Sequence, residues 1–99
     1  MPELQDKIAL ITGAGRGIGQ AIALAYAREG AKLSLAARSV SELEETAAMC
    51  QNLGAEVLIT PTDVTDAGQV QRLVDATVER YTTIGILVNN AGIAGPIGS

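Results

Sequence analysis

The sequence contains no histidine, a single cysteine and only two aromatic residues among its 99 positions. Without histidine, metal sites and acid–base catalysis that depend on an imidazole are excluded. Cys50 cannot form an internal disulfide, and we expect it to be a small buried residue. Tyr26 and Tyr81 are too few for a surface on which nucleic-acid bases stack. Both end apolar stripes, which favours a place in the core over a catalytic role.

Positive charge and long apolar runs are also scarce. Seven basic and eleven acidic residues give a formal net charge of −4, which argues against nucleic-acid or membrane-surface partners. No apolar run reaches the roughly 18 residues that a membrane span requires, and residues 1–7 lack the basic-then-apolar order of a secretory signal. We therefore expect a cytoplasmic protein, and its 99 residues allow at most one domain.

Four short, mostly apolar segments are typical of β-strands, and helical patterns separate them. The expected strands are residues 7–12, 32–37, 56–60 and 84–88. Nearly continuous apolar strands indicate burial on both faces of a sheet. The order β-α-β-α-β-α-β therefore predicts an α/β fold with a parallel sheet and right-handed crossovers.

Apolar residues at helical spacing predict three helices. The first begins at Gly17 and ends near Gly30, and capping boxes begin the second at Ser39 or Ser41 and the third at Asp66. The expected buried face of the first helix consists of Ile18, Ile22, Ala25 and Tyr26. The third helix has the clearest period, with an expected inner face of Val70, Leu73, Val74, Thr77, Val78 and Tyr81.

A glycine-rich turn joins the first strand to the first helix. Its glycines are Gly13, Gly15, Gly17 and Gly19. Such a junction lets backbone N–H groups and a helix N-terminus meet a phosphate. No Gly-Lys pair is present, which excludes a P-loop, and Ile18 breaks the common G-x-G-x-x-G spacing. The turn has the form Thr-Gly-x3-Gly-x-Gly, beginning at Thr12. It predicts a phosphate-containing ligand, and a flexible loop without a ligand is the alternative.

Two further motifs follow later strands. Asp63-Val64 comes after the third strand, and Asn-Asn-Ala-Gly at residues 89–92 comes after the fourth. Together with the glycine turn, they resemble the N-terminal half of the short-chain dehydrogenase/reductase family, over roughly residues 6–95. The resemblance implies a partial Rossmann-type α/β fold, with strand order 3-2-1-4 and helices on both faces of the sheet.

The resemblance also implies a role for each matching residue. The glycines let the backbone reach the cofactor pyrophosphate, Ile18 meets the cofactor through its backbone, and residues 90–92 line the ribose. Asp63 accepts a hydrogen bond from the adenine amino group, and a loop aspartate that caps a turn is the alternative. The predicted cofactor-binding residues are Gly13, Gly15, Arg16, Gly17, Ile18, Gly19, Arg38, Ser39, Asp63, Val64, Asn90, Ala91 and Gly92.

Two arginines bear on the choice of cofactor. NAD-specific sites place an acid at the end of the second strand to hold the ribose 2′-OH. Here Ala36 and Ala37 occupy that place, and Arg38 follows. Arg38 can hold a 2′-phosphate by charge-assisted hydrogen bonds, with Ser39 as a neighbour and Arg16 as a second cation. We therefore expect NADP rather than NAD, and a solvated surface arginine is the alternative.

The catalytic tyrosine of the family, with a lysine four residues on, has no counterpart, because the only lysines are Lys7 and Lys32. We predict no catalytic residue and no metal ligand. The resemblance implies a homo-oligomeric parent enzyme that transfers hydride between NADP(H) and a ketone or secondary alcohol. Residues 1–99 would be the N-terminal, cofactor-binding part, without the catalytic part.

The alternatives are a nucleotide-binding module without chemistry and a structural fragment. Such a partial fold has an apolar sheet edge at the fourth strand, and a single helix covers one face of its sheet. We therefore expect the chain in isolation to be marginally stable or to self-associate.

Overall fold

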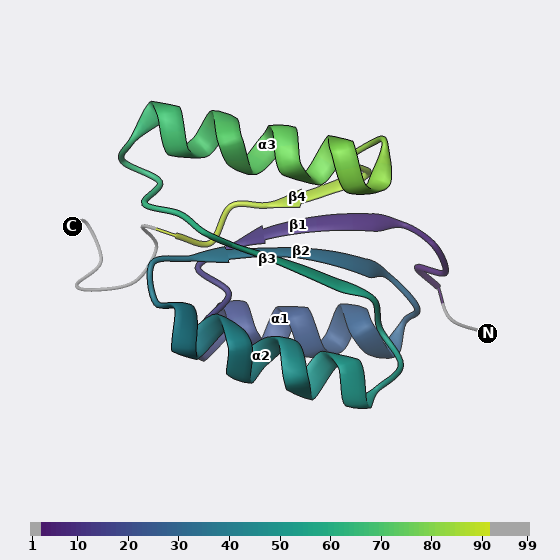
Figure 1. Ribbon diagram of the computed structural model, residues 1–99. Helices are drawn as coiled ribbons and strands as arrows, with labels where there is room; N and C mark the ends of the chain where they lie inside the picture. The colour runs from purple at the N-terminus through teal and green to yellow at the C-terminus, as the bar shows by residue number, and fades with distance from the viewer. Residues whose placement is uncertain (1–2, 92–99) are drawn as a thin grey trace.

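A parallel four-stranded sheet organises residues 3–91, the part of the chain that the computed structural model describes. The elements in chain order are β1 (Ile8–Thr12), α1 (Gly17–Arg28), β2 (Lys32–Ala37), α2 (Val40–Asn52), β3 (Val57–Pro61), α3 (Ala67–Tyr81) and β4 (Ile86–Val88). The strand order is β3-β2-β1-β4, and every neighbouring pair is parallel. Figure 1 shows α1 and α2 on one face and α3 on the other. The predicted fold class, strand order and two-sided helical cover are confirmed.

The core lies on both faces of the central strands. All five residues of β1 are buried, because β2 and β4 flank the strand and helices cover both of its faces. On the side of α1 and α2, the core includes Ala9, Ile11, Leu33, Leu35, Ala23 and Leu43. On the side of α3 it consists of Leu10, Ala36 and Leu73, with Ile84 packed against them. Among residues 3–91, no helix is both long and apolar enough to cross a membrane.

The buried face of α1 differs in part from the predicted one, although Ile22 and Tyr26 do pack against the core as expected. The structure buries Gly19, Ala23 and Ala27, whereas Ile18 is 66% exposed. These buried residues are small and lie four positions apart, so they form one narrow face along which the helix can approach the sheet closely. The prediction chose the most hydrophobic residues for the buried face. The short distance between helix and sheet instead allows only small side chains between them.

Three smaller expectations were also wrong. Pro61 is the last residue of β3 rather than the residue that stops it, because an edge strand tolerates a residue without an N–H group. β4 begins two residues later than expected, at Ile86. Val78 was expected on the inner face of α3 but is 42% exposed. That helix instead directs Leu73, Thr77 and Tyr81 inward.

Cys50 and Tyr81 are core residues, as predicted. Cys50 is fully buried, and this burial raises the pKa of its thiol to about 11, although Arg28 acts in the opposite direction. The thiol is therefore protonated at neutral pH and unreactive. Tyr81 is also buried, and its hydroxyl donates a hydrogen bond to the carbonyl oxygen of Leu33 at 3.3 Å.

A buried hydroxyl pair links α3 to the sheet. Ser34 of β2 and Thr77 of α3 are both fully buried, and their hydroxyl oxygens are 2.7 Å apart. Thr77 donates its single hydroxyl hydrogen to the carbonyl oxygen of Leu73 at 2.8 Å. Ser34 must therefore be the donor in the pair. The bond satisfies a polar group of the central sheet that water does not reach.

Thr77→Val keeps the side-chain shape but removes the acceptor of the Ser34 hydroxyl. We expect the free energy of unfolding to fall by about 1–3 kcal/mol, because a buried donor is left without a partner. Urea denaturation measures the loss. Adding Ser34→Ala to the Thr77→Val chain removes the unpaired hydroxyl and should cost less than Ser34→Ala alone. Strictly additive losses in the double variant would show that the two hydroxyls are not coupled.

Candidate functional site

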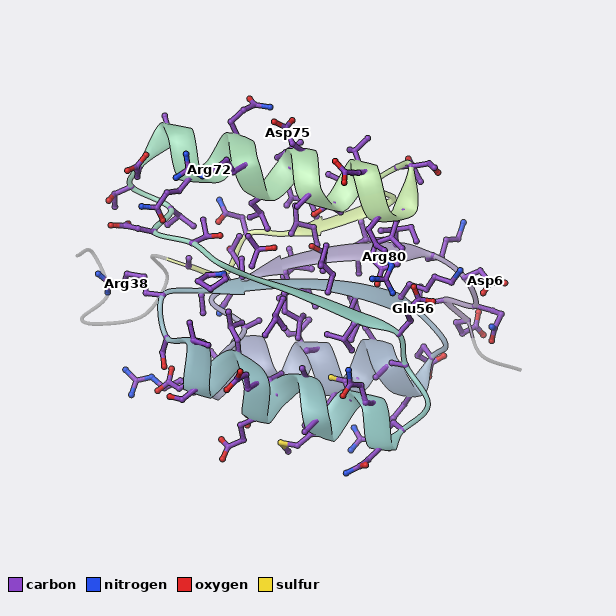
Figure 2. The ribbon with its side chains drawn as sticks, in the orientation of Figure 1. Asp6, Arg38, Glu56, Arg72, Asp75 and Arg80 are labelled. Carbon is purple, nitrogen blue, oxygen red and sulfur yellow. The ribbon has the colours of Figure 1, made fainter. Side chains whose placement is uncertain are left out.

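The predicted site residues gather at one edge of the sheet, where all four strands have their carboxyl ends. The glycine turn follows β1, Arg38 follows β2, Asp63 follows β3 and residues 89–91 follow β4. Figure 2 shows Arg38 at this edge, with Asp6 and Glu56 at the opposite one. From β1 the chain adds β2 and then β3 on one side, and it then crosses over to add β4 on the other side of β1. Open parallel sheets bind ligands at such a switch point, which here lies between β1 and β4.

Two glycines of the turn are required by the packing of the protein itself. A Cβ atom on Gly19 would lie 1.9 Å from the carbonyl oxygen of Gly13 and 2.8 Å from Nδ2 of Asn90. A Cβ atom on Gly13 would also lie 2.8 Å from the same Nδ2 atom. The start of α1 therefore rests directly on the turn, and the turn rests on the segment after β4.

That segment is tied to the end of β1 through one threonine. The Thr12 hydroxyl donates to Oδ1 of Asn89 at 3.1 Å and accepts from the backbone N–H groups of Asn90 at 3.0 Å and Ala91 at 3.1 Å. These bonds use its one hydrogen and both lone pairs. Nδ2 of Asn90 donates to the carbonyl oxygen of Gly13 at 3.1 Å. Asn90 and Ala91 thus lie beside the glycine turn, whereas Gly92 lies outside the described residues.

Two further bonds hold the turn from the side of β2 and α2. The N–H of Ala14 donates to the carbonyl oxygen of Ala36 at 3.0 Å. The fully buried Thr46 of α2 donates its hydroxyl to the carbonyl oxygen of Gly15 at 3.2 Å and accepts from Gln20 at 3.0 Å. Sequence reasoning missed Thr46, because a threonine among the inner positions of an amphipathic helix carries no signal of this contact.

The N-terminus of α1 has backbone donors that the helix does not use. Arg16 occupies the N-cap position with extended backbone, and its side chain makes no capping bond. The first bond of the helix runs from the N–H of Gln20 to the carbonyl oxygen of Arg16 at 3.3 Å. The N–H groups of residues 17–19 therefore lack helical acceptors. In contrast, Ser39 caps α2 and Asp66 caps α3, as predicted. An uncapped helix N-terminus favours an anion.

Gly17 leaves the backbone bare at this helix end. Its φ is +59°, a conformation that disfavours any residue with a Cβ atom, and a Cβ atom built there would meet nothing within 4 Å. The neighbouring Ile18 side chain is 66% exposed. Bare backbone beside unused N–H donors fits a bulky anion such as the pyrophosphate of a dinucleotide. The residues present therefore fit the ligand that the sequence predicts.

Arg38 and Asp63 follow the neighbouring strands β2 and β3, and the charge of Arg38 acts on the Asp63 carboxyl. Hydrogen bonds from the hydroxyl of Thr65 at 2.7 Å and from its N–H at 2.9 Å, together with the charge of Arg38, hold the pKa of the Asp63 carboxyl below its usual value. Both bonds end on Oδ1, so Asp63 does cap a turn, the alternative to its expected role. Val64 beside it is 37% exposed. Among the described residues, no hydrogen bond ends on Oδ2 of Asp63.

The arginines of the site are not engaged in ion pairs with the described residues. Arg16 and Arg38 are both exposed. Across residues 3–91, the one ion pair joins Arg80 to Glu56 at 2.8 Å, at the far edge of the sheet. Neither site arginine therefore has an acidic side chain within 4 Å to neutralise its charge in that range. Exposed guanidinium groups of this kind can bind a phosphate.

A carboxylate that sequence reasoning missed also lies in this corner. A Cβ atom on Gly15 would lie 2.8 Å from Cβ of Glu42 and 3.0 Å from its Oε1 atom. The sequence predicts Glu42 as the partner of Ser39 in a capping box and places it on the outer face of the second helix, so its position against the turn was not expected. Its N–H does donate to the Ser39 hydroxyl at 3.2 Å. No bond returns from the carboxylate to the Ser39 backbone within the described residues, and the carboxylate lies instead against the turn.

A hollow lies at the opposite edge of the sheet, at the amino ends of the strands. It has a volume of about 340 Å³, and its lining includes Asp6, Arg28, Lys32, Gly54 and Glu56. The carboxyl ends of α1 and α2 border it, so it offers no group of unused helix N–H donors. No cluster of three or more cysteine, aspartate or glutamate side chains in residues 3–91 could hold a metal ion. The carboxyl edge of the sheet is therefore the candidate site.

A parallel sheet with a glycine turn and an uncapped helix end at its switch point defines a Rossmann-type nucleotide-binding fold. A family model described as short chain dehydrogenase matches residues 7–98. The chain belongs to this family.

Individual relatives agree with this assignment. Levodione reductase of Leifsonia aquatica is 48% identical over 92 residues, which cover 91% of this chain and 34% of that protein. The short-chain dehydrogenase/reductase homolog YusS of Bacillus subtilis is 43% identical over 89 residues, which cover 89% of this chain and 82% of that protein. Carveol dehydrogenase of Mycobacterium avium, solved in complex with NAD, matches with a TM-score of 0.88 at 29% identity, over 93% of this chain and 38% of that one. The chain spans between 7% and 40% of the length of six other curated relatives.

Thr65→Val removes the hydroxyl donor that contributes most to the low pKa of Asp63. A depressed carboxyl pKa contributes stability above the unfolded-state value of about 3.9, and this contribution is lost as the pH falls through the lower folded value. We expect the variant to titrate Asp63 at higher pH and to lose this contribution earlier on acidification. NMR titration of the side-chain carboxyl carbon measures the shift. Thr83→Val is the control, and an unchanged Asp63 titration in Thr65→Val would contradict the assignment.

Proposed function

We propose that this chain binds a nicotinamide dinucleotide, preferring NADP(H) to NAD(H), as the cofactor-binding part of an oxidoreductase that interconverts ketones and secondary alcohols. One observation carries the preference. Arg38 stands directly after β2, where Ala36 and Ala37 supply no acid for a ribose 2′-OH. Its exposed guanidinium group has no ion-pair partner among residues 3–91. Such a group can bind a 2′-phosphate with charge-assisted bonds.

Each part of the site has a role in this proposal. The N–H groups of residues 17–19 hold the pyrophosphate at the positive end of α1. Oδ2 of Asp63 accepts from the adenine amino group, and Asn90 and Ala91 line the ribose. Arg38 holds the 2′-phosphate, with Ser39 as its neighbour in the chain and Arg16 of the turn as a second cation. When bound, the nicotinamide ring supplies or accepts the hydride. None of these residues moves a proton, and the 99 residues contain no Tyr-x3-Lys pair for that step.

The relatives support the reaction class. Their names are those of a reductase and of a dehydrogenase, and one of them was solved with NAD. Because these names refer to different compounds, we propose no particular substrate within the class of ketones and secondary alcohols. Because that structure contains NAD, the relatives do not favour NADP over NAD, and our preference for NADP rests on the residues of this chain.

Arg38→Asp tests the cofactor preference. Replacing the cation by an anion should weaken NADPH binding by about 2 kcal/mol or more, or roughly 30-fold, through a lost charge-assisted bond and a new repulsion. NADH, which has no 2′-phosphate, should bind with nearly unchanged affinity. Fluorescence titration of both nucleotides measures the two dissociation constants.

Arg72→Asp provides a matched control for the Arg38 variant. Arg72 is exposed on α3, which covers the face of the sheet opposite α1 and α2, and the substitution changes the net charge by the same amount. We expect it to leave both affinities within about twofold, since screening by salt limits the effect of a distant surface charge. Equal weakening of NADPH and NADH by Arg38→Asp would count against a role for Arg38 in holding a 2′-phosphate.

Gly17→Ala tests the phosphate site independently of cofactor preference. Gly17 and Gly54 both have positive φ, at +59° and +90°, and a Cβ atom on either would meet nothing within 4 Å. Alanine at either position should therefore cost a similar amount of stability, about 1–2 kcal/mol. Only Gly17→Ala places a methyl group on the backbone that we propose meets the pyrophosphate.

We therefore expect Gly17→Ala to weaken NADPH and NADH alike, by about tenfold or more, which corresponds to about 1.4 kcal/mol. Gly54→Ala should melt at a similar temperature but bind both nucleotides like the wild-type chain. Thermal unfolding and fluorescence titration measure the two effects separately. Similar affinities in the two variants would show that the bare backbone at Gly17 does not meet the cofactor.

A further inference from the structure

We infer that Glu42 is a specificity-determining residue that opposes the binding of NADP(H) and favours NAD(H). The inference rests on the proposed function, because it concerns the same corner of the site. Arg38 follows β2, whereas Glu42 enters from the first turn of α2. Arg38 would attract the 2′-phosphate and Glu42 would repel it, so the preference for NADP(H) would be smaller than with Arg38 alone.

The position of Glu42 against the turn is fixed by two independent contacts. A Cβ atom on Gly15 would lie 2.8 Å from Cβ of Glu42 and 3.0 Å from Oε1, so both parts of the side chain lie over the turn. Thr46, four residues further along α2 and therefore on the same face, donates its hydroxyl to the carbonyl oxygen of Gly15 at 3.2 Å. The helix face that includes Glu42 is thus held on the turn by a buried hydrogen bond.

The charge of Glu42 is not neutralised by a neighbouring cation. The side chain is half-buried, and across residues 3–91 the one ion pair lies elsewhere, between Arg80 and Glu56. The carboxylate therefore stands as an anion beside the turn, in a partly buried setting where screening by water and salt is weaker than at the open surface.

The same corner contains the residues proposed to hold the 2′-phosphate. Ser39 accepts a hydrogen bond from the N–H of Glu42 at 3.2 Å, and Arg38 directly precedes Ser39 in the chain. A carboxylate can accept a hydrogen bond from a ribose 2′-OH but repels a phosphate at the same position. Glu42 would therefore act toward the ribose as an acid at the end of the second strand does in NAD-specific sites.

Glu42→Gln tests this inference with little change in shape. The capping bond at Ser39 uses the backbone N–H of residue 42, which glutamine keeps. We expect the ratio of NADPH to NADH affinity to rise about tenfold, mainly through tighter NADPH binding. Fluorescence titrations of the 99-residue chain with each nucleotide measure the ratio. Glu42→Ala is the second variant, and it should move the ratio in the same direction.

Glu44→Gln is the matched control, because Glu44 is exposed on the same helix and its substitution changes the net charge by the same amount. We expect it to leave the ratio within about twofold. An unchanged ratio in Glu42→Gln and Glu42→Ala, or an equal shift in Glu44→Gln, would overturn the inference while the proposed function stands. If the wild-type chain bound neither nucleotide saturably, the proposed function would fail and the inference with it.

Discussion

The contact between Gly19 and the carbonyl group of Gly13 sets the geometry of the whole site. Since a Cβ atom at Gly19 would lie 1.9 Å from that oxygen, only a residue without a side chain permits the observed approach of α1 to β1. This approach continues along the helix through Ala23 and Ala27, which are buried with Gly19. It also places the N-terminus of α1 at the switch point between β1 and β4, and it leaves room for Asn90 to reach the Gly13 carbonyl. A larger residue would displace the helix and move its N–H groups away from the switch point.

Three carbonyl oxygens of the turn accept hydrogen bonds from the protein, and one N–H group, that of Ala14, donates to the carbonyl oxygen of Ala36. The carbonyl oxygens of Gly13, Gly15 and Arg16 accept bonds from Asn90, Thr46 and Gln20, respectively. The N–H groups of residues 17–19 have no helical acceptors. The protein therefore satisfies the acceptors of the turn internally and keeps donors for a ligand. A turn arranged in this way suits an anion and does not suit a metal cation, which needs oxygen atoms. Its rigidity comes from elements distant in sequence, since Thr46 and Asn90 belong to different parts of the chain.

The features that the sequence predicts correctly are those encoded over short distances. The strands, the caps at Ser39 and Asp66 and the glycine spacing each depend on neighbouring residues, and parallel crossovers then restrict the sheet to few topologies. The features it does not predict depend on how closely two elements pack. Hydrophobicity favours Ile18 over Gly19 as a buried residue, but the short distance between helix and sheet reverses that order. Likewise, only the packing of α2 on the glycine turn reveals that Glu42 and Thr46 meet Gly15.

Cofactor choice at such a site is a difference between two affinities, so modest charge effects can decide it. The groups at the corner are exposed or half-buried, and no single pair among them is worth much in water. Arg38 also helps to lower the pKa of Asp63. The positive charge of Arg38 therefore interacts with a carboxylate of the protein as well as with the proposed phosphate. A carboxylate on α2 adds an opposing charge that the sequence near β2 does not reveal. In our proposal, the residue after β2 therefore gives the direction of the cofactor preference, and a carboxylate on the helix packed against the turn reduces its size.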